Sequence, residues 1–166
     1  MSAVLTEGPL RFDFTHAESA ERLDVPGQQA PHGMMLADFV VGEAAQRLLI
    51  EVKGPSALEG PPPRSAASAR RLAKHEWVTQ VLVPKARDSY TFLHLMMQDD
   101  KPFLYVVVLD LGPIEKALLL PFRDRLLNGV RHEAAEPWKR TYVRDCIVVR
   151  VDEWQTHFPE YPLARE

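Results

Sequence analysis

Two apolar runs, residues 36–41 and 48–53, flank a short polar segment and predict a β-hairpin. Successive side chains of a strand point to opposite faces of a sheet, so each run divides into two faces. One face of the hairpin is wholly apolar and carries Ala37, Phe39, Val41, Leu48, Ile50 and Val52. The other face carries Leu36, Asp38, Val40, Leu49, Glu51 and Lys53. All charges of the two runs therefore lie on a single face.

The predicted register sets Asp38 opposite Glu51. A turn centred on Ala44 and Ala45 gives this antiparallel pairing. Ala-Ala is a poor two-residue hairpin turn, so we expect a longer loop over residues 43–46, which keeps the same register. Two carboxylates and an ammonium group then share one face of the hairpin.

The charged face of such a hairpin could simply be exposed to solvent. Against this interpretation, Leu36, Val40 and Leu49 lie on the same face, which favours partial burial. Carboxylates that are partly buried among apolar neighbours need a cation to hold their charge. Oxygen ligands suit a hard divalent ion, so Mg²⁺ or Mn²⁺ is the expected cofactor.

The order of Asp38, a strand and then Glu51-Val52-Lys53 resembles the PD-(D/E)xK nuclease superfamily, which includes type II restriction enzymes, Holliday-junction resolvases and many DNA-repair and phage-defence nucleases. The resemblance implies that Asp38, Glu51 and the Val52 carbonyl bind the metal, while Lys53 positions the attacking water. Ala37 departs from the motif, whose name expects proline at that position. Together with the segments that follow, the motif looks like an uncharacterised bacterial branch of the superfamily.

The fold implied by this resemblance is an α/β, restriction-endonuclease-like mixed sheet, with an α-β-β-β-α-β core flanked by helices. The length of 166 residues fits a single domain over residues 1–166. Thr15 and Glu18 have the spacing of a capping box, which predicts the opening helix over residues 15–23. In the superfamily this helix often lends a further acid to the metal, for which Glu21 and Glu18 are the candidates.

The remaining pattern predicts helices and strands along the whole chain. The expected elements are a strand over 10–14, a loop over 24–33, a loop over 54–63 that could act as a lid, helices over 65–80 and 87–98 with a break at Pro84, a buried strand over 102–109, a strand over 114–120, a helix over 122–128 ended by Gly129, and a last strand over 146–151.

Basic residues are unevenly spread along a chain whose net charge is -3. Such a net charge is not typical of a nucleic-acid-binding domain. A basic block precedes the middle of the chain, and a second basic segment is expected to open the helix that begins near residue 87. The candidate phosphate contacts are Arg70, Arg71, Lys74, Lys85 and Arg87. A solvated helix face remains the alternative for the first block.

The sequence thus predicts a metal-dependent nuclease that acts on DNA in preference to RNA. The alternative is a catalytically silent nuclease-like fold that binds nucleic acid or protein. A homodimer that buries Trp138, Trp154 and Phe158 is a further hypothesis. One cysteine, Cys146, excludes disulfides within the chain, and the scattered histidines do not have zinc-ligand spacing. No apolar segment reaches transmembrane length, so we expect a cytoplasmic protein that does not act at a membrane.

Overall fold

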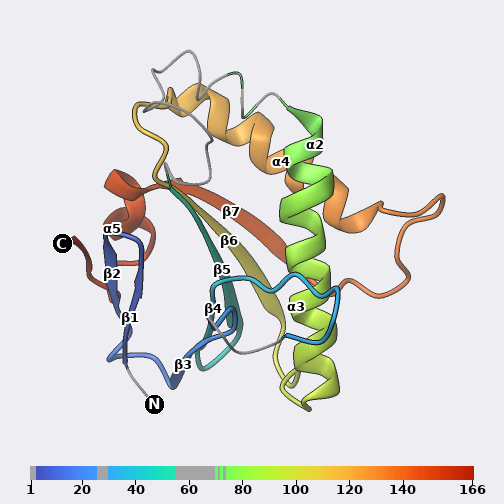
Figure 1. The fold of residues 1–166 in the computed structure, drawn as a ribbon, viewed down its shortest axis with the longest axis horizontal. Helices are drawn as coiled ribbons and strands as arrows, with labels where there is room; N and C mark the ends of the chain where they lie inside the picture. Colours follow the sequence, from blue (N-terminus) through green and yellow to red (C-terminus); the bar gives the residue numbers. More distant parts are fainter. Residues whose placement is uncertain (1–2, 26–29, 55–69, 71, 73) are drawn as a thin grey trace.

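A five-stranded mixed sheet forms the centre of the computed structural model, which describes residues 3–25, 30–54, 70, 72 and 74–166 (Figure 1). Its strands, in spatial order, are β3 (Ser19–Arg22), β4 (Phe39–Gly42), β5 (Arg47–Lys53), β6 (Phe103–Leu109) and β7 (Asp145–Arg150). The first three strands are antiparallel neighbours, whereas β6 and β7 run parallel to β5. The fold is therefore mixed α/β, as the sequence predicts.

A small antiparallel sheet and a short helix cover one face of the central sheet. The small sheet has the order β1 (Val4–Glu7), β2 (Leu10–Asp13) and β8 (Leu163–Arg165). A 3-10 turn, η4 (Val151–Glu153), leads into the helix α5 (Trp154–His157). Phe12 and Trp154 pack edge to face with ring centroids 5.1 Å apart, within the same core as Phe39 and Ile50. The apolar face of the hairpin lies in this core.

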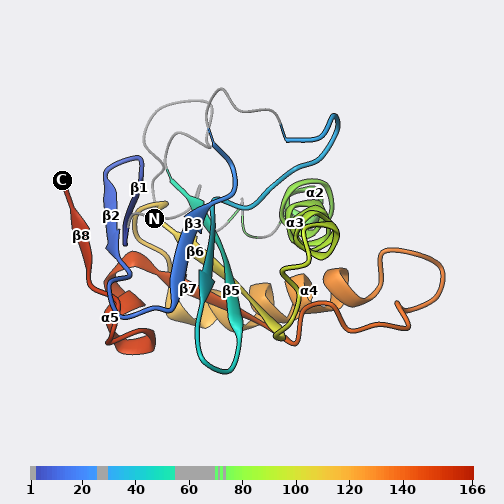
Figure 2. The ribbon, with the colours of Figure 1, turned by 90° about the horizontal axis from the view of Figure 1, so that it is seen from below.

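Helices cover the face of the central sheet opposite the small sheet, as both ribbon views show (Figures 1 and 2). They are α2 (His75–Trp77), the π-helical segment η2 (Val78–Leu82), α3 (Val83–Leu95), the 3-10 turn η3 (Lys116–Leu118) and α4 (Leu119–Arg131). Buried residues of α3 and α4 share a core with Leu49 and Tyr105 of the central sheet. Among the described residues, no helix has the length and apolar character needed to cross a membrane.

The predicted helix over residues 15–23 is wrong. The Asp13 carboxylate accepts hydrogen bonds from the Thr15 amide at 3.0 Å and from its hydroxyl, so Thr15 takes part in a turn rather than in a helix cap. Residues 19–22 then form β3, which pairs with β4. Ala20 packs in the core while Glu21 is exposed, an alternation that fits a strand. The local capping signal is overridden by pairing with a strand that lies later in the chain.

The predicted break at Pro84 is also wrong, because helical structure continues from His75 to Leu95. Pro84 has no amide hydrogen to donate, and it is the second residue of α3, directly after the π-helical segment η2. The preceding residues bond in the wider π pattern. The segment that contains Lys85 is thus inside a helix and does not begin one. Residues 65–69, 71 and 73 of the predicted first helix lie outside the described residues.

The C-terminal third contains two further differences from the predicted elements. Residues 114–120 do not form a strand, since η3 and the start of α4 occupy part of this range. Gly129 does not end the helix. A Cβ atom at Gly129 would lie 2.9 Å from Val83 Cγ2, so glycine allows α4 to approach α3 closely. The strands expected over 10–14, 102–109 and 146–151 are confirmed as β2, β6 and β7, whereas β1 and β8 were not predicted.

Candidate functional site

The hairpin of β4 and β5 brings Asp38 and Glu51 together at one end of the central sheet. Phe39 pairs with Ile50, and the Glu43 amide donates to the Gln46 carbonyl at 2.9 Å. The predicted register and the four-residue loop are therefore confirmed. Asp38 and Glu51 stand one residue beyond the last hydrogen-bonded pair of this ladder. Their face is the one whose apolar members, Val40 and Leu49, pack under the helices.

Asp38 is buried and bonded to the main chain of the opposite strand. The residue is 6% exposed, and its Oδ2 accepts a hydrogen bond from the Val52 amide at 2.7 Å. The N–H and C=O of one residue point to the same side of an extended strand, so the Val52 carbonyl also points to the Asp38 side. Burial, followed by the nearby charge of Glu51, raises the pKa of Asp38 to about 7.

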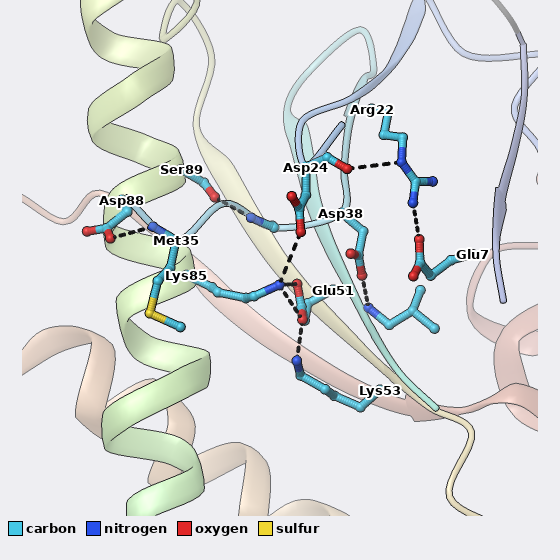
Figure 3. A network of polar contacts seen from close by, with 12 residues as sticks. Glu7, Arg22, Asp24, Met35, Asp38, Glu51, Lys53, Lys85, Asp88 and Ser89 are labelled. Atoms are coloured by element: carbon cyan, nitrogen blue, oxygen red, sulfur yellow. Dashed lines mark hydrogen bonds and ion pairs between the residues drawn. The ribbon is translucent and has the colours of Figure 1, made fainter. Parts of the chain in front are cut away.

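Glu51 is the most deeply buried acid of this site, at 1% exposed, and two ammonium groups contact it. Lys53 Nζ lies 2.6 Å from Glu51 Oε1. Lys85 Nζ, which comes from α3, lies 3.0 Å from Oε1 and 3.1 Å from Oε2 (Figure 3). Burial lowers the pKa of Lys85, but the charges of Glu51 and Asp38 outweigh burial, so the pKa is raised overall. Lys85 is therefore an ammonium ion at neutral pH.

One face of α3 also holds the segment that leads into Asp38. The Met35 amide donates to Asp88 Oδ2 at 2.9 Å, and the Ala37 amide donates to the buried Ser89 hydroxyl at 2.8 Å. Lys85, Asp88 and Ser89 are spaced i, i+3 and i+4, so their side chains project from the same side of the helix. The helix thus fixes both the approach to Asp38 and the counter-ion of Glu51 (Figure 3).

A cavity of about 260 Å³ opens beside these groups. Its lining residues are Glu7, Gly8, Pro9, Leu10, Asp24, Asp38, Glu51, Val52, Lys53, Gly54, Lys85 and Asp110. Three further acids at its walls were not predicted from the sequence. Asp24 is exposed, Glu7 pairs with Arg22, and Asp110 pairs with Arg165 at 2.6 Å. Glu7 comes from the small sheet, Asp24 from the chain after β3 and Asp110 from the residue that follows β6, a meeting of distant segments that no local motif predicts.

Several other predicted site residues lie away from the cavity. Glu18 contacts Lys101 Nζ at 2.5 Å, and Glu21 is exposed on β3, so the structure brings neither acid to Asp38 and Glu51. Arg87 pairs with Asp88 at 2.9 Å and with Glu133 at 2.5 Å.

The predicted basic block and lid are described only in part. Arg70 and Lys74 are exposed. Arg71 lies outside the described residues, as does the loop over residues 54–63 except for its first residue, Gly54. Of the predicted phosphate contacts that the structure describes, Lys85 alone lines the cavity.

The donor set can be tested against the expected divalent ion. Two carboxylates and a main-chain carbonyl are hard oxygen donors, which suit Mg²⁺ or Mn²⁺ with water at the remaining positions. The raised pKa of Asp38 reflects burial and negative charge, both of which a cation would offset. Within the described ranges, no three or more His, Cys, Asp or Glu side chains cluster in a way that could hold a metal. Asp38, Glu51 and the Val52 carbonyl are thus the candidate oxygen donors for such an ion, and the described residues include no larger set of side-chain ligands.

The aromatic residues expected at a dimer surface are divided between core and surface. Trp154 and Phe158 are buried in the core beneath the small sheet, and their packing leaves them unavailable to a partner. Trp138 is partly exposed. The predicted three-residue aromatic surface is therefore wrong, because Trp154 of α5 and Phe158, the residue after α5, both point into the core.

Comparisons with protein-family models, with curated proteins and with solved structures found no match to this chain.

Proposed function

We propose that the protein is a metal-dependent nuclease that hydrolyses phosphodiester bonds, with DNA as the favoured substrate. The observation that carries this proposal is the meeting of Asp38 and Glu51 at the wall of a cavity, with Lys53 Nζ 2.6 Å from Glu51. Two acids and one amine at this point are the groups that the resemblance to PD-(D/E)xK nucleases implies.

The order of the elements around the site also supports a restriction-endonuclease-like fold. From β3 to β6 the chain forms three antiparallel strands, a helical segment and a parallel strand. This order agrees with the β-β-β-α-β part of the superfamily core. The core should open with a helix, whereas residues 4–13 of this chain form β1 and β2. The proposed relationship therefore rests on the part of the core that carries the motif.

Each residue of the motif has a distinct task in the proposed reaction. Asp38, Glu51 and the Val52 carbonyl would hold Mg²⁺ or Mn²⁺, which when bound acidifies water, polarises the phosphoryl oxygen and offsets developing negative charge. Lys53 keeps a positive charge at the cavity wall, where it can orient the attacking water and stabilise charge on the phosphorus oxygens. Its burial strengthens this effect, because electrostatic interactions are stronger at low local dielectric.

A silent binding module is the second candidate function, and one observation favours it. Both carboxylate oxygens of Glu51 already contact ammonium groups, so the charge of this acid is balanced by protein alone. A buried acid paired in this way can serve a purely structural role. The two candidates differ in one property, since only the nuclease requires a divalent ion at Asp38 and Glu51.

Cleavage assays with matched variants test the proposal. Purified protein is incubated with supercoiled plasmid, linear DNA and RNA in Mg²⁺ or Mn²⁺. We expect metal-dependent cleavage of DNA that is lost in Glu51→Gln and retained in Glu21→Gln, a control on the exposed surface of β3. Absence of cleavage in both metals, or cleavage that Glu51→Gln leaves intact, rejects the nuclease. Metal-independent DNA binding without cleavage supports the binding module.

A further inference from the structure

Lys85 contacts both oxygens of the acid that is proposed to bind the metal. Its ammonium lies 3.0 Å from Glu51 Oε1 and 3.1 Å from Oε2, whereas Lys53 contacts Oε1 (Figure 3). The Lys85 side chain is 14% exposed and lines the cavity. The position that a cation would take between the two carboxylate oxygens is therefore covered by a side chain from α3.

Binding of a divalent ion to Glu51 is weakened as long as the Lys85 ammonium contacts the same carboxylate. Both are positive, and within a few ångströms in a buried setting their repulsion is strong. Lys85 also has a second acid within reach. Asp24 Oδ2 lies 4.0 Å from its Nζ, and the Asp24 side chain is 58% exposed at the cavity wall. A lysine side chain has several rotatable bonds, so its ammonium can move from the inner acid towards the outer one.

We propose that Lys85 is an internal cation that competes with the divalent metal for Glu51 and moves towards Asp24 when the metal binds. This inference rests on the proposed function, since it concerns the same metal site. It concerns Lys85 because Lys85 contacts both oxygens of Glu51, whereas Lys53 contacts Oε1. Lys85 lowers the metal affinity of the site and keeps Glu51 paired when no metal is present.

Calorimetric titration with Mn²⁺ alone tests the competition. Lys85→Met keeps most of the aliphatic stem and removes the charge, and Lys116→Met is the control because Lys116 is 80% exposed and does not line the cavity. We expect Lys85→Met to bind Mn²⁺ roughly tenfold more tightly than the wild type, within the range of about 5- to 150-fold usual for coupled sites. Lys116→Met should match the wild type.

The possible outcomes separate this inference from the proposed function. If the wild type binds Mn²⁺ and Lys85→Met binds it equally or more weakly, the competition is overturned while the metal site stands. If neither protein binds Mn²⁺, the metal site itself is overturned, and the inference falls with it. If only Lys85→Met binds, the lysine masks the site, which supports the competition.

Amine labelling of the wild type provides a test that does not depend on the folding of a variant. The protein is treated with a lysine-acylating reagent with and without saturating Mn²⁺, and modification is quantified by mass spectrometry. We expect Lys85 to become several-fold more reactive when Mn²⁺ is bound, because its ammonium has left the buried acid. Lys116 should not change. Unchanged labelling of Lys85 in Mn²⁺ that is shown to be bound overturns the proposal.

Discussion

The Asp38 carboxylate accepts a hydrogen bond from the amide of Val52 at 2.7 Å, and Val52 is the middle residue of the triplet that follows one strand later. This bond ties the isolated acid of the motif directly to the strand that carries the other two groups. It also indicates that the Val52 carbonyl points towards Asp38, because the N–H and C=O of one residue point to the same side of a strand. The spatial unit is therefore built by the hairpin itself, before any metal is considered.

Asp38→Asn should make the metal-free protein more stable at pH 8. The folded-state pKa of Asp38 is about 7, above its ordinary value of 3.8, so the folded protein binds this proton more tightly than the unfolded chain does. Its contribution to stability therefore falls as the pH rises from about 4 to about 7 and is level above that. We expect the variant to gain on the order of 4 kcal/mol at pH 8 and almost nothing near pH 4.

Urea unfolding in the presence of a chelator, repeated from pH 4 to pH 8, measures this difference. Asp124→Asn is the matched control, because the Asp124 side chain is 60% exposed on α4. Its stability should follow that of the wild type at every pH. Parallel stability curves for Asp38→Asn and the wild type would show that burial of Asp38 has no such cost.

Ser89→Ala should disturb the site from a distance. The Ser89 hydroxyl is buried and accepts the Ala37 amide at 2.8 Å, so the variant leaves a buried N–H without its acceptor. We expect a loss of about 1–3 kcal/mol in the free energy of unfolding. Cleavage should fall about tenfold as the segment before Asp38 loosens. Thr91→Ala is the control, since the Thr91 hydroxyl bonds only to the Arg87 carbonyl of its own helix among the contacts described. An equal effect of both variants would contradict this role of Ser89.

Much of the site is predictable from the sequence because it depends on the alternation of side chains between the two faces of neighbouring strands. The faces and register of the hairpin follow from the two-residue period of residues 36–53, and the structure confirms them. Strand β6 is equally evident, because its continuous apolar run matches a strand buried on both faces. Residues of the motif are thus placed by the same pattern that defines their strands.

The parts that fail depend on contacts between distant segments. A capping box and a strand compete for residues 15–23, and pairing with β4 decides the outcome. Pro84 indicates a break locally, yet packing of η2 and α3 against the sheet keeps the helical segment continuous. Lys85 therefore reaches Glu51 from within a helix. No periodicity in the sequence predicts that the Lys85 ammonium contacts both carboxylate oxygens of Glu51.

Lys53→Met should separate metal binding from chemistry. Lys53 contacts one oxygen of Glu51 and supplies no metal ligand, so the variant should retain Mn²⁺ binding in calorimetry. Cleavage should fall by about 10²- to 10³-fold, the usual effect of removing one group that stabilises the transition state. The exposed Lys116→Met serves again as the matched control. A variant that cleaves at the wild-type rate would remove Lys53 from the proposed reaction.

Anomalous diffraction from crystals soaked in Mn²⁺ tests the shared metal site most directly. We expect one strong peak about 2.1 Å from oxygens of Asp38, Glu51 and the Val52 carbonyl, with the Lys85 ammonium displaced from Glu51. Crystals of Glu51→Gln should lack that peak under the same conditions. A wild-type crystal without manganese at these oxygens, in which Lys85 still contacts both oxygens of Glu51, would contradict the account.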